Sequence, residues 1–105
     1  MERTGAFVRK LLQEKDSLSD AGNCRNSVSQ IEKAVKQEFP TAQVDILVHP
    51  EAKAGLGVHY SLEVDQNGEK TLINAVPAPG FPQYIGDPEN AHPVFRSMKK
   101  TTKVI

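Results

Sequence analysis

Residues 58–76, VHYSLEVDQNGEKTLINAV, decide the fold of this 105-residue chain. Apolar and polar side chains alternate strictly over 58–64, which is the period of a β-strand with one buried face. The sequence DQNG at 65–68 is typical of a tight hairpin turn, and residues 70–76 form the returning strand. The stretch therefore predicts an antiparallel β-hairpin.

Two amphipathic helices are expected before the hairpin, over 3–15 and 23–38. In each of them apolar side chains recur at the helical period and form one stripe. The two stripes consist of Phe7, Val8, Leu11 and Leu12 in the first helix, and of Cys24, Val28, Ile31 and Val35 in the second. Pro40 ends the second helix, because the residue before a proline is pushed out of helical backbone space.

The rest of the chain supplies one more strand and little further regular structure. Alternation over 43–48 predicts a strand, and residues 49–57 form a loop with two glycines. Residues 76–93 are rich in proline and glycine and leave room only for a short extended piece around 83–85, and the basic residues after them form a solvated terminus. We therefore expect one α+β domain over 1–105, with two N-terminal helices followed by a small antiparallel sheet.

The composition excludes several classes of function. The chain has 13 acidic and 13 basic residues and a formal net charge of zero, so as a whole it is not built to bind nucleic acid or an anionic membrane. No apolar run reaches the ~18 to 20 residues of a membrane span. One cysteine cannot form an internal disulfide, which fits a protein that acts in the cytoplasm. The histidine spacing suits no metal site and the glycines match no phosphate-binding motif, so we expect neither a metal nor a cofactor.

The sequence GNCRN, residues 22–26, places this cysteine at the start of the second helix. Unpaired backbone N–H groups and the helix dipole stabilise a thiolate there, and they can also bind a developing oxyanion. With Asn23 as the N-cap, Cys24 is the first helical residue and gains most, whereas with Asp20 as the cap the effect is weaker. Cys24 is therefore a candidate nucleophile, although its place on the apolar stripe equally fits a core residue.

His59 and Asn74 lie on the two strands of the hairpin, and the turn decides whether they share a face. A loop of residues 66–67 puts Asn74 directly opposite His59, and a loop of residues 67–68 puts it opposite Ser61, diagonal to His59 on the same face. A three-residue loop would move Asn74 to the other face. Asparagine is a poor strand residue, and its amide can accept a hydrogen bond from an imidazole N–H.

Cys24, His59 and Asn74 are the candidate catalytic residues. A nucleophilic cysteine needs a histidine to take its proton and a third group to orient that histidine. Asn74 is the expected orienting group, and Asp87, which follows the hairpin, is the alternative. Taken singly, each of the three has a structural interpretation, with Cys24 in the core, His59 on a half-solvated face and Asn74 at a bulge.

The order of these residues, within GNC, VHYSLEV and LINAV, resembles the papain-like fold. In miniature the chain looks like the papain-fold effector domains of bacterial polymorphic toxins, such as those of contact-dependent inhibition. The resemblance implies a thiol protease or deamidase that acts on a protein substrate in the cytoplasm of a target cell, with a cognate immunity protein as partner. The family's glutamine before the cysteine has no counterpart, so Asn23 or a backbone group would serve the oxyanion.

Two other functions fit the pattern less well or less specifically. A small ribonuclease toxin would use His59 and His92 together with the basic C-terminal residues Arg96, Lys99, Lys100 and Lys103. The neutral net charge and Glu63 on the face of His59 count against it, because RNA binding depends on positive charge. A non-enzymatic interaction module, in which Cys24 is only part of the core, requires none of this chemistry.

Overall fold

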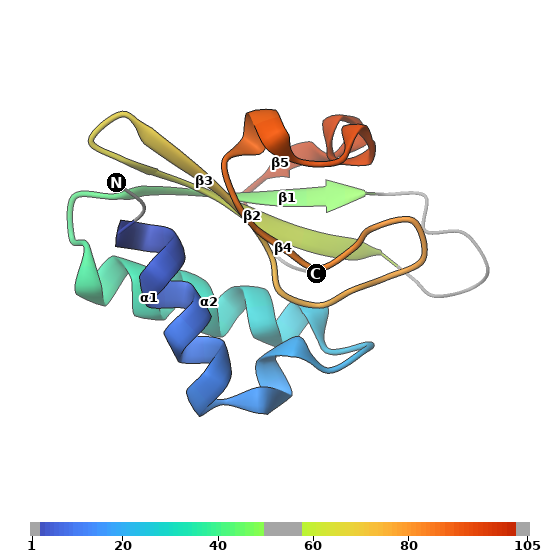
Figure 1. Ribbon diagram of the computed structural model, residues 1–105, viewed down its shortest axis with the longest axis horizontal. Helices are drawn as coiled ribbons and strands as arrows, with labels where there is room; N and C mark the ends of the chain where they lie inside the picture. Colours follow the sequence, from blue (N-terminus) through green and yellow to red (C-terminus); the bar gives the residue numbers. More distant parts are fainter. Residues whose placement is uncertain (1–2, 50–57, 103–105) are drawn as a thin grey trace.

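The computed structural model describes residues 3–49 and 58–102 and has the expected α+β architecture. The helices α1 (Arg3–Glu14) and α2 (Cys24–Glu38) are joined by the 3-10 helix η1 (Asp16–Ser19) and pack on one face of a sheet (Figure 1). The strands are β1 (Gln43–His49), β2 (His59–Gln66), β3 (Glu69–Asn74), β4 (Tyr84–Gly86) and β5 (Lys99–Thr101). The 3-10 helices η3 (Pro88–Asn90) and η4 (Pro93–Ser97) lie on the other side of the sheet.

The five-stranded sheet has the order β4-β3-β2-β1-β5, and all its neighbouring strands are antiparallel. Gln66 pairs with Glu69, so Asn67 and Gly68 form a two-residue loop. Both have positive φ, 54° and 87°, as the turns that match the twist of a hairpin require. This register, continued by one pair, sets Asn74 opposite Ser61 and on the face of His59, which confirms the second of the two registers expected for an even loop.

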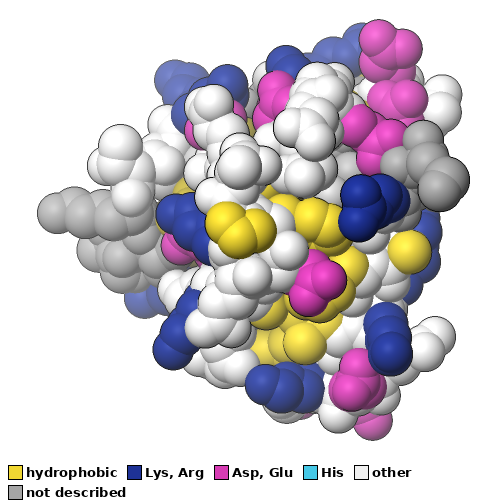
Figure 2. Space-filling model, turned by 90° about the vertical axis from the view of Figure 1, so that its left-hand side faces the viewer, with side chains coloured by type: hydrophobic (Ala, Val, Ile, Leu, Met, Phe, Trp, Pro, Cys, Tyr) yellow, Lys and Arg dark blue, Asp and Glu magenta, His cyan; other side chains and the backbone are white. Residues whose placement is uncertain are grey.

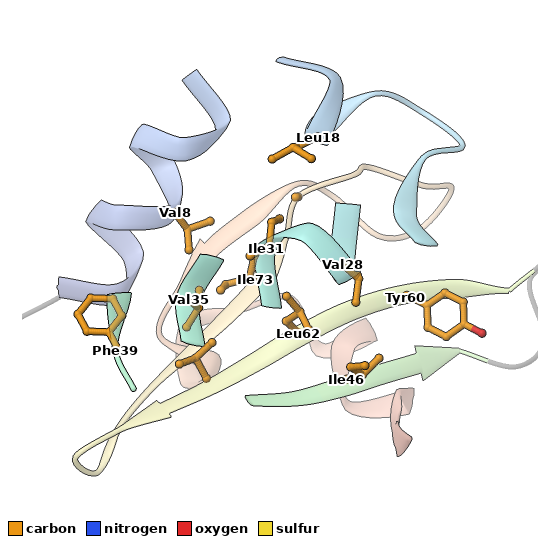
Figure 3. Packing of buried hydrophobic residues seen from close by; sticks show 12 residues of the cluster. Val8, Leu18, Val28, Ile31, Val35, Phe39, Ile46, Tyr60, Leu62 and Ile73 are labelled. Atoms are coloured by element: carbon orange, nitrogen blue, oxygen red, sulfur yellow. The ribbon is translucent and has the colours of Figure 1, made fainter. Parts of the chain in front are cut away.

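One face of the sheet carries a continuous apolar core against α1 and α2, the helix-side core (Figure 3). Leu62 and Ile73 from the sheet meet Ile31 and Val35 from α2, and all four are almost fully buried. The residues buried in this core are Val8, Leu18, Val28, Ile31, Val35, Phe39, Ile46, Tyr60, Leu62, Val64, Ile73 and Ala75. They include Val28, Ile31 and Val35 of the predicted apolar stripe of α2, while Cys24, the first residue of that stripe, is partly buried against the core.

The opposite face carries a smaller layer, which we call the far-side cluster. It consists of Leu47, Leu72, Phe81 and Phe95. Phe81 and Phe95 come from the chain after β3 and stack edge to face, with ring centroids 5.7 Å apart. The proline-rich segment and the C-terminal 3-10 helices therefore cover the side of the sheet that α1 and α2 leave open.

The element boundaries differ from the sequence-based ones by one or two residues, and one expectation was wrong. The C-terminal residues do not form a solvated terminus, because Lys99–Thr101 pair with β1 as strand β5. Lys99 and Lys100 remain exposed, and Lys100 forms an ion pair with Asp45 at 3.3 Å, so backbone pairing rather than an apolar pattern holds this strand. The loop expected over 49–57, apart from its first residue, and Lys103 lie outside the described residues.

Figure 2 shows one face of the molecule, on which acidic and basic side chains are interspersed around a hydrophobic area. Neither sign of charge dominates this face. Within residues 3–49 and 58–102, no helix combines the length and the apolar character that crossing a membrane requires.

Candidate active site

Cys24 opens α2 and Asn23 occupies the N-cap position, as the sequence predicts. The side chain of Asn23 makes no capping bond, because its Nδ2 donates instead to the carbonyl of Ser17 at 2.8 Å. The Asn23 carbonyl accepts from the N–H of Ser27 at 2.9 Å, as the carbonyl of an N-cap residue does. The Asn23 side chain therefore joins the start of α2 to η1 and does not accept a hydrogen bond from the backbone N–H groups of the first helical turn.

The thiol of Cys24 donates to the carbonyl of Val58, with 3.7 Å between Sγ and O. Val58 directly precedes β2, so Cys24 lies beside the end of the strand where His59 stands. The side chain of Cys24 is partly buried and packs against the helix-side core.

His59 and Asn74 form a buried side-chain pair, with 2.8 Å between Nε2 and Oδ1. His59 is 5% exposed and Asn74 is 0% exposed. The hairpin produces the pair, because its register puts the two residues diagonally on one face. The predicted contact between His59 and Asn74 is thus present.

The amide of Asn74 is held in one orientation by four hydrogen bonds. Its Nδ2 donates to the carbonyls of Phe81 at 3.3 Å and Pro82 at 2.8 Å, and these groups can only accept. Its Oδ1 therefore faces His59 and Ser61, whose hydroxyl donates to it at 2.7 Å. Since Oδ1 only accepts, Nε2 of a neutral His59 carries the proton, and the lone pair of the ring lies on Nδ1.

The surroundings of His59 favour its neutral form. Phe81 packs on the imidazole with 5.0 Å between ring centroids, and His49, the cross-strand partner of His59, contacts the same phenyl ring at 5.1 Å. Burial lowers the pKa of His59 from its ordinary value of 6.5, the bond to Asn74 raises it, and the neighbouring His49 lowers it, with a net decrease. His59 is therefore a neutral base at physiological pH.

Cys24 and His59 lie at the same end of β2 but on opposite sides of its backbone. Cys24 packs with the helix-side core, whereas the ring of His59 contacts Phe81 of the far-side cluster. No hydrogen bond joins the thiol to the imidazole among the described residues, where the thiol is bonded to Val58 and the imidazole to Asn74. The structure brings His59 and Asn74 together and places Cys24 next to the residue that precedes His59.

The other candidate residues have separate local roles. The Asp87 carboxylate accepts from the N–H of Glu89 and caps η3 on the surface, while Asn74 makes the contact with His59. The ring of His92 accepts from the N–H of Val94 and caps η4. In the part of the chain that the structure describes, no three His, Cys, Asp or Glu side chains gather as metal ligands would.

Three contributors to this site were not predicted. Ser61 could have been found, because strand alternation puts it on the face of His59 and the observed register puts it opposite Asn74. His49 stands at the end of β1, and its contact with Phe81 depends on strand pairing. Phe81 arrives through a proline-rich turn whose path no periodic pattern reveals.

Comparisons with known proteins give no match to this chain, whether with family models, curated proteins or solved structures.

Proposed function

We propose that this chain is a cysteine-dependent hydrolase or amidotransferase that acts on a protein substrate through a thioester, with Cys24 as nucleophile, His59 as base and Asn74 as orienting group. The observation that carries the proposal is the buried Nε2–Oδ1 contact of 2.8 Å between His59 and Asn74, in an arrangement that leaves Nδ1 as the basic nitrogen. A general base needs a group that selects its tautomer, and Asn74 is placed to do so.

The chemistry follows from these groups. The thiol proton of Cys24 passes to Nδ1 of His59, and the sulfur attacks the carbonyl carbon of a peptide or side-chain amide. The oxyanion accepts from backbone N–H groups at the start of α2, and Asn23 is next to them. Nδ1–H then protonates the departing amine or ammonia and leaves a thioester. Water, or a second amine, gives a proton to Nδ1 and attacks the thioester, which restores the thiol.

The resting state in this proposal is a neutral pair rather than a thiolate–imidazolium pair. The thiol donates to Val58, and burial keeps the pKa of His59 low. The first step therefore requires Cys24 to leave the Val58 carbonyl and to reach Nδ1 around the end of β2. Cys24 is partly buried, and this movement must carry its sulfur past the end of β2, because the two side chains lie on opposite sides of that strand.

Proteolysis, deamidation and acyl transfer share this thioester, and the residues present favour none of them. The likeness to papain-fold toxin domains adds that the chain acts in the cytoplasm of a target cell and is neutralised by an immunity protein. The ribonuclease alternative is less well supported, because the chain has 13 acidic and 13 basic residues and no excess of the positive charge on which RNA binding depends.

Alkylation of the only cysteine tests the proposal without a known substrate. We expect His59→Gln to slow the labelling of Cys24 by iodoacetamide about tenfold, because the base that removes the thiol proton is lost. Asp87→Asn is the matched control and should not change the rate. Mass spectrometry of the intact protein follows the reaction. Slow labelling that is unaffected by His59→Gln would reject the proposal and favour a non-enzymatic module with Cys24 in the core.

A further inference from the structure

The turn after β3 folds back over the His59–Asn74 pair, and we call residues 78–82 the strap. Ala78 and Phe81 exchange backbone hydrogen bonds of 3.0 and 2.8 Å, which close the turn. Gly80 supplies the positive φ of 82° that this turn needs. Gln83 Nε2 donates to the carbonyl of Ala75 at 2.9 Å and joins the chain on either side of the strap. The strap is thus a closed turn attached to the end of β3.

The strap makes two kinds of contact with the pair. Its carbonyl oxygens at Phe81 and Pro82 accept both N–H groups of the Asn74 amide. The phenyl ring of Phe81 lies against the imidazole of His59, with the ring planes inclined by 35°. One short segment therefore holds the amide by its nitrogen and the imidazole by its face.

These contacts decide which side chain can stand at position 74. A carboxylate there would set an oxygen against the carbonyl oxygens of Phe81 and Pro82, and a flipped amide would do the same. Only an amide with its nitrogen toward the strap satisfies all the groups. Its oxygen is then directed at Ser61 and His59, which are fixed on β2.

We infer that the strap is the positioning element of His59, in which Phe81, through its carbonyl and its ring, fixes the Nε2–H tautomer and leaves Nδ1 as the basic nitrogen. Phe81 acts through Asn74 and the imidazole and does not itself react. Its effect on the tautomer is independent of the role of Cys24, and its effect on catalysis rests on the proposed function.

Matched glycine variants test this role. Gly80 and Gly68 both have positive φ, 82° and 87°, and both leave open space for a Cβ, so Gly80→Ala and Gly68→Ala introduce the same backbone strain. Only Gly80 belongs to the strap. The readout is nitrogen-15 NMR of the histidine side chains at neutral pH, in the Cys24→Ser variant, so that no activity is required.

In the parent protein we expect a protected Nε2–H proton on His59 and an unprotonated Nδ1. Gly80→Ala should let the Nε2–H proton exchange with water at least tenfold faster and give a mixture of tautomers, whereas Gly68→Ala should leave both signals in place. Phe81→Leu keeps an apolar cover but removes the ring and should also speed the exchange. The inference is overturned if Gly80→Ala and Phe81→Leu leave the His59 signals unchanged, or if Gly68→Ala changes them equally.

Discussion

The two faces of the sheet differ in what holds them together. On the helix side, aliphatic and aromatic side chains from the helices and the strands form one large core, which has no charged member among the described residues. On the far side, a cluster of four buried apolar residues, of which Phe81 contacts His59 and Asn74, accompanies a polar network of His59, Asn74 and Ser61. Burial of apolar area stabilises the first face, whereas the network on the second depends on the hydrogen bonds that pair Asn74 with its neighbours.

This difference indicates a division of roles between the faces. A buried polar network costs free energy unless every member is paired, so it is expected where orientation matters more than stability. The four bonds of Asn74 meet that requirement. The helix-side core supplies the stability, and the far side supplies the geometry of the candidate site.

The largest expected effect comes from truncating one leucine on each face. Leu62 is fully buried in the helix-side core and Leu72 is 3% exposed in the far-side cluster. Leu62→Ala should lower the free energy of unfolding by about 3 to 5 kcal/mol. Leu72→Ala should lower it by about 2 to 3 kcal/mol, because fewer buried residues pack around Leu72 in the far-side cluster. Urea denaturation measures both values. An equal or larger loss for Leu72→Ala would contradict the assignment of stability to the helix side.

Two buried serines give a smaller effect and a sharper comparison. Ser27 donates to the Leu18 carbonyl on the helix side, and Ser61 donates to Asn74 on the far side. Ser27→Ala should cost about 1 to 3 kcal/mol, because it leaves the buried carbonyl of Leu18 without its donor. Ser61→Ala should cost about 1 kcal/mol, because the Asn74 oxygen keeps its bond to His59.

Only Ser61→Ala should also change the nitrogen-15 signals of the His59 ring, because it removes the second donor to the oxygen that His59 contacts. Ser27→Ala serves as its control for lost stability. If the two variants alter the His59 ring alike, the far-side network is not a separate unit.

Much of the fold could be predicted, because it rests on local patterns. The alternation of β2 and the stripe of α2 are periodic, and the positive φ of Asn67 and Gly68 follows from the turn sequence. Strand β5 could not be predicted, since its lysines are exposed and its pairing is non-local. The contact between His59 and Asn74 could be predicted on one condition, which is that the hairpin loop has two residues rather than three. The strap could not be foreseen, because tertiary contacts fix the path of a proline-rich turn.

The smallest expected effect is the pH dependence that His59 gives to the far side. Because the folded protein lowers the pKa of this ring, mainly by burial, the unfolded chain binds more protons between the lowered value and the ordinary 6.5. The contribution of neutral His59 to stability is therefore complete above about pH 6.5 and is lost as the pH falls through the lowered value. His59→Gln keeps an N–H donor for Asn74. In this variant the urea concentration at the midpoint of unfolding should change less with pH over this range. His92→Asn, on the exposed cap of η4, should leave the slope contributed by His59 in place. A slope that His59→Gln does not reduce would mean that the network tolerates a charged imidazole, and the far side would then not select the neutral base that the proposed chemistry requires.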